Sequence, residues 1–124
     1  MFEVGIVAQF EAAHRLRGDF GPAARLHGHT YRVEVSVRGE ALKEDGTLCD
    51  ITLVQRAVEG VLARMHYREL TELEVFEGRN TTAEVVAQVL FQQIAPALTG
   101  QGVSSLGVRV WESPQAYAAY EGDM

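Results

Sequence analysis

The sequence predicts an α+β domain, in which a four-stranded antiparallel sheet carries two helices on one of its faces. Apolar and polar residues alternate in two segments near the N-terminus and in the C-terminal part of the chain, as in half-buried strands. Between them lie two segments with apolar residues at helical spacing. No repeat, low-complexity tract or linker interrupts the chain, so we expect a single domain over residues 1–124.

The first two strands are predicted at residues 2–13 and 29–38. In the first, the even positions from Phe2 to Ala12 are apolar, and Glu3, Gln9 and Glu11 lie between them. The second alternates in the same way, with apolar residues at its odd positions. The segment "RLRGDFGPAAR" between them contains glycine and proline, which favour a loop. We therefore expect the two strands to pair as an antiparallel hairpin.

Two helices follow, at residues 51–65 and 81–98. Asp50 and Thr52 are both candidates for the cap of the first helix. Thr81 and Glu84 match the S/T-x-x-E capping box at the start of the second.

The remaining extended segments flank these helices. Residues 48–51 ("LCDI") are predicted to be a short extended piece before the first helix, and residues 103–113 and 116–122 the last two strands. The order strand, strand, helix, helix, strand, strand is the reason for expecting an antiparallel rather than a parallel sheet.

Charge and composition exclude several classes of protein. A net charge of −6 and a pI near 5.1 argue against a general nucleic-acid binder. Cys49 is the only cysteine, so no intrachain disulfide is possible and a reducing compartment is indicated. The N-terminal segment lacks the features of a signal peptide, and no apolar run approaches the ~20 residues that span a membrane. We expect a cytoplasmic protein without membrane or nucleic-acid partners.

Three histidines fall on the apolar face of the predicted hairpin. His14 shares its parity with Phe10, while His27 and His29 share theirs with Tyr31. Antiparallel pairing brings the end of the first strand beside the start of the second, so the three imidazoles converge. Three neutral imidazoles with one open position are typical of a catalytic zinc site. A single strand histidine is more often a packed or surface residue, and it is the third member, His14, that favours metal.

Several short motifs together resemble the 6-pyruvoyltetrahydropterin synthase and 6-carboxytetrahydropterin synthase family. They are, in family order, "FEAAH", "RLHGHTYRV", "CDITLVQRAV", "NTTAEVVA" and "VRVWES", and they cover nearly the whole chain. The resemblance implies the tunnelling fold, in which subunits join through sheet edges into trimeric barrels and hexamers. We therefore expect a homo-oligomer, either a trimer or a dimer of trimers.

The resemblance also implies site residues. Zn²⁺ would be held at the positions of His14, His27 and His29, and a pterin would be recognised by Glu112 with help from Thr81 and Thr82. A carboxylate suits this task because it can accept two N–H groups from the amidine edge of a pterin. Without the resemblance to this family, we would interpret Glu112 as an exposed residue before a turn, and Thr81 and Thr82 as a helix cap.

The groups that move protons in the family are altered here. The loop from Arg15 to Leu26 contains no cysteine and no glutamate, and its one acidic residue is Asp19. Where relatives carry an Asp-His pair after the first helix, this chain has His66 and Tyr67. His66 is a candidate general base because its ordinary pKa lies near neutrality, and Tyr67 is a weaker candidate donor. His66 could equally be a solvent-facing residue at a helix end, and Tyr67 could donate a proton only with a strongly shifted pKa.

Arginines crowd the same loop and its ends. Arg15, Arg17 and Arg25 could hold a phosphorylated substrate tail, although each taken alone is more simply a solvated loop residue. The lone Cys49 lies outside this loop and is more typical of a small buried residue than of a nucleophile.

The residues therefore indicate a zinc-dependent enzyme acting on a reduced pterin such as dihydroneopterin triphosphate, by elimination, rearrangement or cleavage of the side chain. Two alternatives stay open: a non-catalytic zinc- and pterin-binding homologue, and an assembly protein that keeps only the fold.

Overall fold

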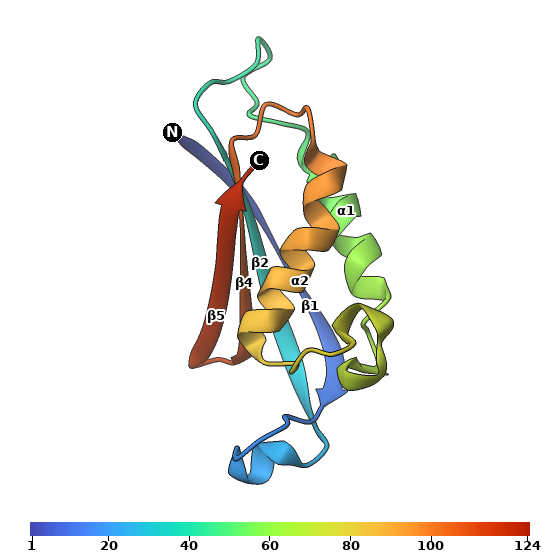
Figure 1. Ribbon diagram of the computed structural model, residues 1–124. Helices are drawn as coiled ribbons and strands as arrows, with labels where there is room; N and C mark the ends of the chain where they lie inside the picture. The colour runs from blue at the N-terminus through green and yellow to red at the C-terminus, as the bar shows by residue number, and fades with distance from the viewer.

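A computed structural model describes residues 1–124 and has two layers, a sheet and two helices packed on one of its faces (Figure 1). The five strands follow the order β3-β1-β2-β4-β5 in the sheet. The elements are β1 (Phe2–His14), β2 (His27–Gly39), α1 (Ile51–Ala63), β3 (Arg68–Glu69), α2 (Ala83–Ile94), β4 (Ser105–Ser113) and β5 (Ala116–Asp123). The α+β class and both predicted helices are confirmed.

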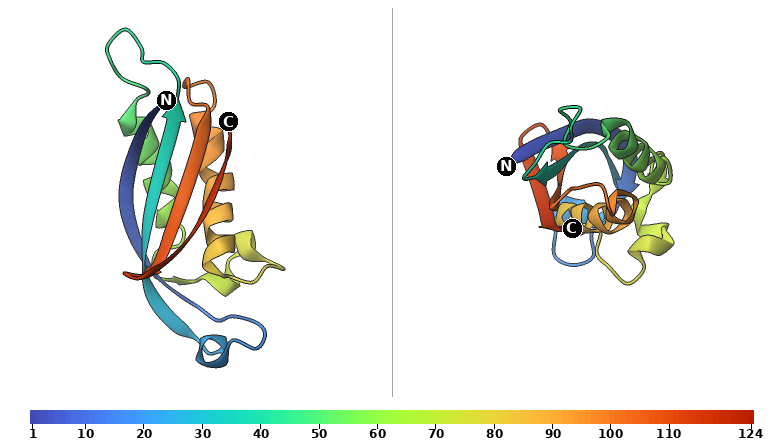
Figure 2. Two further views of the ribbon diagram at one scale, coloured as in Figure 1. Left: turned by 90° about the vertical axis from the view of Figure 1, so that its left-hand side faces the viewer. Right: turned by 90° about the horizontal axis from the view of Figure 1, so that it is seen from above.

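The N-terminal hairpin has the predicted register. Phe2 lies opposite Gly39 and His14 lies opposite His27, so β1 and β2 pair along their whole length. The even side chains of β1 and the odd side chains of β2 face the helices, where Phe10 and Tyr31 are fully buried and stack at 4.8 Å between ring centroids. Seen from above in Figure 2, the curved sheet and the helices enclose this core.

The helices form because their apolar residues share one face. α1 buries Val54, Val58, Val61 and Leu62 against the core. α2 buries six residues, Ala83, Val86, Ala87, Val89, Leu90 and Ile94. A short 3₁₀ turn, Ala95–Leu98, extends α2, because Pro96 has no N–H to continue the α-helical pattern.

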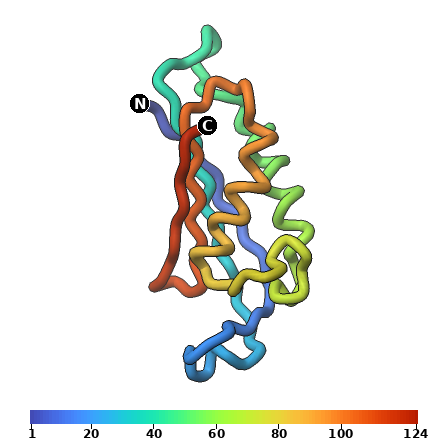
Figure 3. Tube along the Cα trace, in the orientation of Figure 1, coloured from blue at the N-terminus to red at the C-terminus, as the bar shows by residue number.

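The fold places two loops at opposite ends of the molecule (Figure 3). The loop of residues 15–26 joins the ends of β1 and β2 that carry the histidines, and it contains a 3₁₀ turn at Gly21–Ala24. The loop of residues 40–50 and both chain termini lie at the other end (Figures 1 and 3).

Two sequence predictions are corrected here. The sheet has five strands rather than four, because Arg68 and Glu69 add a two-residue strand parallel to β1 at Ala12 and Ala13. A strand this short leaves no alternation in the sequence. Of the extended piece predicted at residues 48–51, Asp50 has extended backbone angles as the helix cap, whereas Ile51 already belongs to α1, and no strand forms there.

No helix of the chain is both long and apolar enough to cross a lipid bilayer.

The cap of α1 carries a prediction about stability. The Asp50 carboxylate accepts a hydrogen bond from the backbone N–H of Thr52 at 2.9 Å. Replacing Asp50 with alanine leaves that N–H without a protein partner, and we expect a loss of about 1 kcal/mol in the free energy of unfolding. Asp50→Asn keeps an acceptor oxygen and should lose much less. Urea denaturation measures both, and equal losses in the two variants would contradict the cap assignment.

Candidate metal centre

Three imidazoles meet at the end of the hairpin, on its helix-covered face. His14 ends β1, His27 begins β2 directly opposite, and His29 follows two residues later on the same face. Their ring centroids lie 4.5 to 5.1 Å apart, and one ring nitrogen from each lies within 4.8 Å of the other two. The convergence expected from side-chain parity is therefore present in the structure.

Backbone carbonyls orient two of the three rings. His14 Nδ1 lies 2.7 Å from the carbonyl oxygen of Thr81, and His27 Nδ1 lies 2.7 Å from that of Arg25. A carbonyl oxygen only accepts hydrogen bonds, so each Nδ1 carries the proton and each Nε2 keeps a free lone pair. This is the arrangement that metal-binding histidines use to fix the tautomer and the ring.

Two of the Nε2 atoms are buried without a partner. His14 Nε2 and His29 Nε2 are shielded from solvent and form no hydrogen bond. Buried polar atoms are nearly always satisfied, so the free lone pair of His14 Nε2, in a ring that packs against the other two, indicates a missing partner with a positive charge. The three nitrogens therefore fit a divalent cation that prefers imidazole, such as zinc.

Thr81 holds His14 rather than capping α2. It is fully buried, and its hydroxyl lies 3.3 Å from the same Nδ1 that its carbonyl binds. The cap is instead Thr82, whose Oγ1 accepts from the N–H of Val85. The capping box expected at Thr81 and Glu84 is thus wrong: the cap lies one residue later, at Thr82, and Val85 cannot complete a box with it. Tertiary contact with β1 fixes Thr81 before the helix begins.

Glu112 and Tyr31 border the histidines. The Glu112 Oε2 atom lies 3.4 Å from His29 Nε2. The Tyr31 hydroxyl is buried and has no hydrogen-bond partner. Burial, and then the charge of Glu112, raise the pKa of Tyr31 well above its usual range, so the phenol stays protonated and keeps a hydrogen that it can donate to an acceptor. The alternation of residues in the sequence predicts that Tyr31 is buried, but it does not predict that the Tyr31 hydroxyl lies beside the histidines.

His66 and Tyr67 lie outside the histidine cluster of their own chain. The Nδ1 atom of His66 accepts a hydrogen bond from the backbone N–H of Glu11 at 3.0 Å, which places the ring proton on Nε2. The two rings pack at 3.9 Å, and Tyr67 is 79% exposed in a left-handed backbone conformation, with a φ of 59°.

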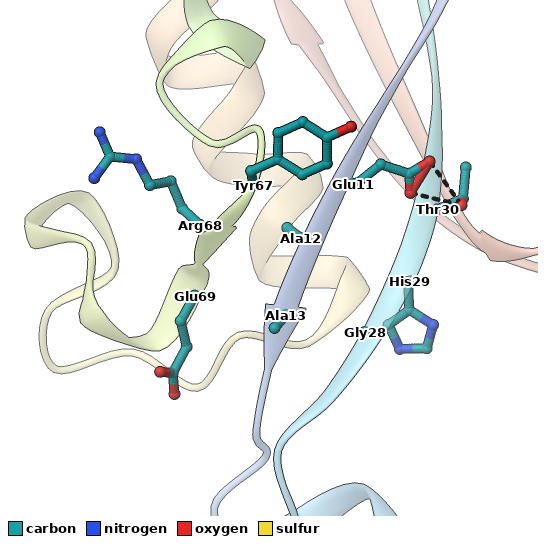
Figure 4. A pocket seen from close by; sticks show the side chains of 9 residues that line it. All are labelled: Glu11, Ala12, Ala13, Gly28, His29, Thr30, Tyr67, Arg68 and Glu69. Atoms are coloured by element: carbon teal, nitrogen blue, oxygen red, sulfur yellow. Dashed lines mark hydrogen bonds between the residues drawn. The ribbon is translucent and has the colours of Figure 1, made fainter.

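Tyr67 lines an open pocket together with residues of β1, β2 and β3 (Figure 4). Glu11 and Thr30 are hydrogen-bonded across it, and the imidazole of His29 points away from Tyr67. Within one chain, the two candidate proton-transfer residues therefore do not reach the metal centre.

Residues 3–123 match the family model described as 6-pyruvoyl tetrahydropterin synthase. The chain belongs to this family. It is 33% identical to a putative 6-carboxy-5,6,7,8-tetrahydropterin synthase from Pyrococcus abyssi, over 89% of this chain and 83% of that protein. It is 31% identical to a dihydroneopterin monophosphate aldolase from Pyrococcus furiosus, over 85% and 84% of the two chains.

The fold agrees with this assignment to the 6-pyruvoyl tetrahydropterin synthase family. The structure of the Caenorhabditis elegans 6-pyruvoyl tetrahydropterin synthase superposes with a TM-score of 0.85 at 25% identity, covering 98% of this chain and 95% of that one. This chain is thus similar throughout its length to pterin-metabolising enzymes whose names specify different reactions.

The loop of residues 15–26 beside the metal centre is anchored to neighbouring segments. Asn80 exchanges hydrogen bonds with both the N–H and the carbonyl of Arg17, and Arg15 forms an ion pair with Glu69 at 3.1 Å. Cys49 does not supply the missing thiol within one chain. It lies beyond the far end of β2, whose 13 residues span roughly 40 Å. Cys49 is buried, and burial raises the pKa of its thiol.

The metal-free protein should lose stability in acid because of His14. Burial lowers the pKa of His14 from 6.5, and the positive charges that His27 and His29 can carry lower it further. These effects outweigh the Thr81 carbonyl and Glu112, which raise it. At a pH between 6.5, the ordinary pKa of histidine in the unfolded chain, and the lower pKa of His14 in the folded protein, the unfolded chain binds a proton that the folded protein does not. The free energy of unfolding therefore falls as the pH falls through that window.

Urea denaturation in the presence of a chelator, across this pH window, measures the effect. His14→Gln removes the group and should flatten the pH dependence. A stability that rises on acidification of the wild-type protein would contradict the sign of the shift.

Proposed function

We propose that this protein is a zinc-dependent enzyme that acts on the side chain of a reduced pterin, such as dihydroneopterin triphosphate or monophosphate. The observation that carries the proposal is the set of three convergent histidines, two of which have their Nδ1 atoms held by carbonyl oxygens. Membership of the 6-pyruvoyl tetrahydropterin synthase family supports the pterin. Bound at His14, His27 and His29, zinc would supply Lewis-acid polarisation of substrate oxygens.

The pterin ring would be held by Glu112, Thr81 and Thr82. Glu112 offers a carboxylate that is 27% exposed on the face of the sheet that carries the histidines. Thr82 accepts from Val85 through its oxygen, which leaves its hydroxyl hydrogen free to donate to a ligand. These roles rest on the resemblance and on the position of the residues around the site.

The reaction would be an elimination, rearrangement or cleavage in the substrate side chain. It would break a carbon–oxygen bond, as in a carbon–oxygen lyase, or a carbon–carbon bond, as in an aldolase. His66 and Tyr67 are the candidate proton-transfer groups, and they would act from a neighbouring subunit. His66 carries its ring proton on Nε2, so in this state it can offer a hydrogen bond from that atom but cannot act as an acid. A role as base requires the hydrogen bond from Glu11 to break first.

We propose that the chain assembles into a trimer or a dimer of trimers. The outer edge of β5 has no partner, and β1 is covered by β3 only at Ala12 and Ala13. Unpaired strand edges are templates for pairing with another chain. Analytical ultracentrifugation should give a trimeric or hexameric mass, and a monomer at all concentrations would reject the assembly.

Product analysis tests the activity. Zinc-loaded protein is incubated with dihydroneopterin triphosphate and, separately, with the monophosphate, and the pterin products are separated by chromatography. We expect one of the two to be converted, and a chelator to abolish the conversion. No product from either substrate at any pH would reject an enzyme of this class.

A non-catalytic zinc- and pterin-binding protein is the second candidate, favoured by the loop of residues 15–26, which contains no cysteine or glutamate. It predicts tight pterin binding, measured by fluorescence quenching, without turnover. Turnover that His66→Ala abolishes would reject this non-catalytic candidate.

An assembly protein that keeps only the fold is excluded if each chain binds one zinc ion.

A further inference from the structure

The loop of residues 15–26 begins and ends at histidines of the metal centre. His14 immediately precedes the loop and His27 immediately follows it, and the two are the last residue pair of the β1–β2 ladder. The end of a ladder is where a hairpin frays, and a long loop resists this little by itself. The distance between the two imidazoles therefore depends on what holds the loop.

One side chain holds the loop through both of its polar atoms. Asn80 Oδ1 accepts a hydrogen bond from the backbone N–H of Arg17 at 2.9 Å, and Asn80 Nδ2 donates to the carbonyl oxygen of the same residue at 3.0 Å. A side-chain amide suits this task because it carries an acceptor and a donor side by side. The other polar link from the loop to a distant segment is the ion pair of Arg15 with Glu69, in which Arg15 is exposed and which therefore contributes little.

The segment that carries Asn80 is itself fixed. It enters α2 past the end of the hairpin that carries the histidines (Figure 1). The next residue, Thr81, is fully buried, and its carbonyl oxygen lies 2.7 Å from His14 Nδ1. Thr82 then caps α2. Three consecutive residues thus connect the loop, the ring of His14 and a helix of the core.

We infer that Asn80 is a positioning residue for the metal centre, and this inference rests on the proposed zinc site. Arg17 is three residues beyond His14, so the Asn80 amide closes the loop next to the ladder end and keeps His14 opposite His27. Without this amide the loop opens more often and the two imidazoles are less often together. A metal ion bound by both histidines favours the same closed loop, so the amide and the ion strengthen each other.

Trypsin reports the opening of the loop in the full chain. Cleavage of a transiently opened segment follows the population of the open form. Asn80→Ala removes both hydrogen bonds to Arg17, so metal-free protein should be cut about 10-fold faster after Arg17 and Arg25. Lys43 lies in the loop of residues 40–50 at the opposite end of the molecule, and cleavage after it is the internal control that should not change (Figure 3).

Cobalt(II) reports the effect on the metal centre. Wild type, Asn80→Ala and the control Glu84→Ala are titrated with Co²⁺ against a competing chelator. We expect Asn80→Ala to bind Co²⁺ about 10-fold more weakly, the lower end of the effect of residues that support metal ligands. Glu84 is a matched control because it is exposed in the first turn of α2, and its variant should keep wild-type affinity. Saturating Co²⁺ should also slow cleavage after Arg17, but not after Lys43.

The outcomes separate the inference from the proposed function. Wild type that binds one Co²⁺ per chain, with unchanged affinity in Asn80→Ala, overturns the inference even if the loop is cut faster, and it leaves the metal site intact. Wild type that binds no Co²⁺ overturns both.

Asn80→Asp tests the same contact more gently. It keeps an acceptor for the N–H of Arg17 and loses the donor to the carbonyl, so its Co²⁺ affinity and its cleavage rate should lie between those of wild type and Asn80→Ala. If Asn80→Ala does not fold, wild-type affinity in Asn80→Asp overturns the inference.

Discussion

His27→Ala abolishes stoichiometric metal binding if the three-histidine site is correct. His27 begins β2 directly opposite His14, and the carbonyl of Arg25 holds its Nδ1, so Nε2 is the atom lost from the site. A site left with two imidazoles should bind zinc at least about 100-fold more weakly, because losing a ligand costs more than losing a residue that supports one. Metal content after dialysis and competition with a chelator measure the loss, and turnover of the pterin should fall with it.

The chain provides a matched control for this experiment. It has four histidines, and His66 is the one outside the cluster. His66→Ala removes an imidazole of the same kind and should retain one zinc per chain with wild-type affinity. Equal loss of metal in both variants, or full retention in His27→Ala, would contradict the assignment of the site.

Removing the metal should lower the stability of the wild-type protein by several kcal/mol. The site joins the end of β1, the start of β2 and the segment before α2, through His14 and Thr81, so a bound ion favours the folded chain over the unfolded one. An ion present at 1,000 times its dissociation constant contributes about 4 kcal/mol to the free energy of unfolding. Thermal denaturation with zinc and with chelator measures the difference.

The same measurement on His27→Ala shows whether the stabilisation comes from this site. That variant should show a much smaller shift, because an ion at only about 10 times its weakened dissociation constant contributes about 1.4 kcal/mol. A zinc-dependent shift in His27→Ala as large as that of the wild type would place the bound ion elsewhere in the chain.

Alternation alone determined the hairpin and the histidine cluster. Side chains on a strand change face with every residue, so parity placed His14, His27 and His29 on one face. Antiparallel pairing then brought them to one end. These are local rules that hold whenever both segments are strands, and the structure bears them out.

The residues around the cluster were decided by tertiary structure. Thr81 contacts His14 across 67 positions of the chain, and this contact moved the helix cap to Thr82. The two-residue strand at Arg68 was too short to leave a pattern, and it exists only because β1 lies beside it.

The sequence by itself determined the two-layer fold, the converging histidines and, through its motifs, the family. Only the tertiary structure decided that Glu112 lies against His29, that Tyr31 turns an unpaired hydroxyl into the core beside them, and that His66 Nδ1 accepts a hydrogen bond from Glu11. The physical reason is the range of the interactions. Periodicity records which face a residue occupies, whereas the partner across that face depends on strand register and on contacts between segments distant in the chain.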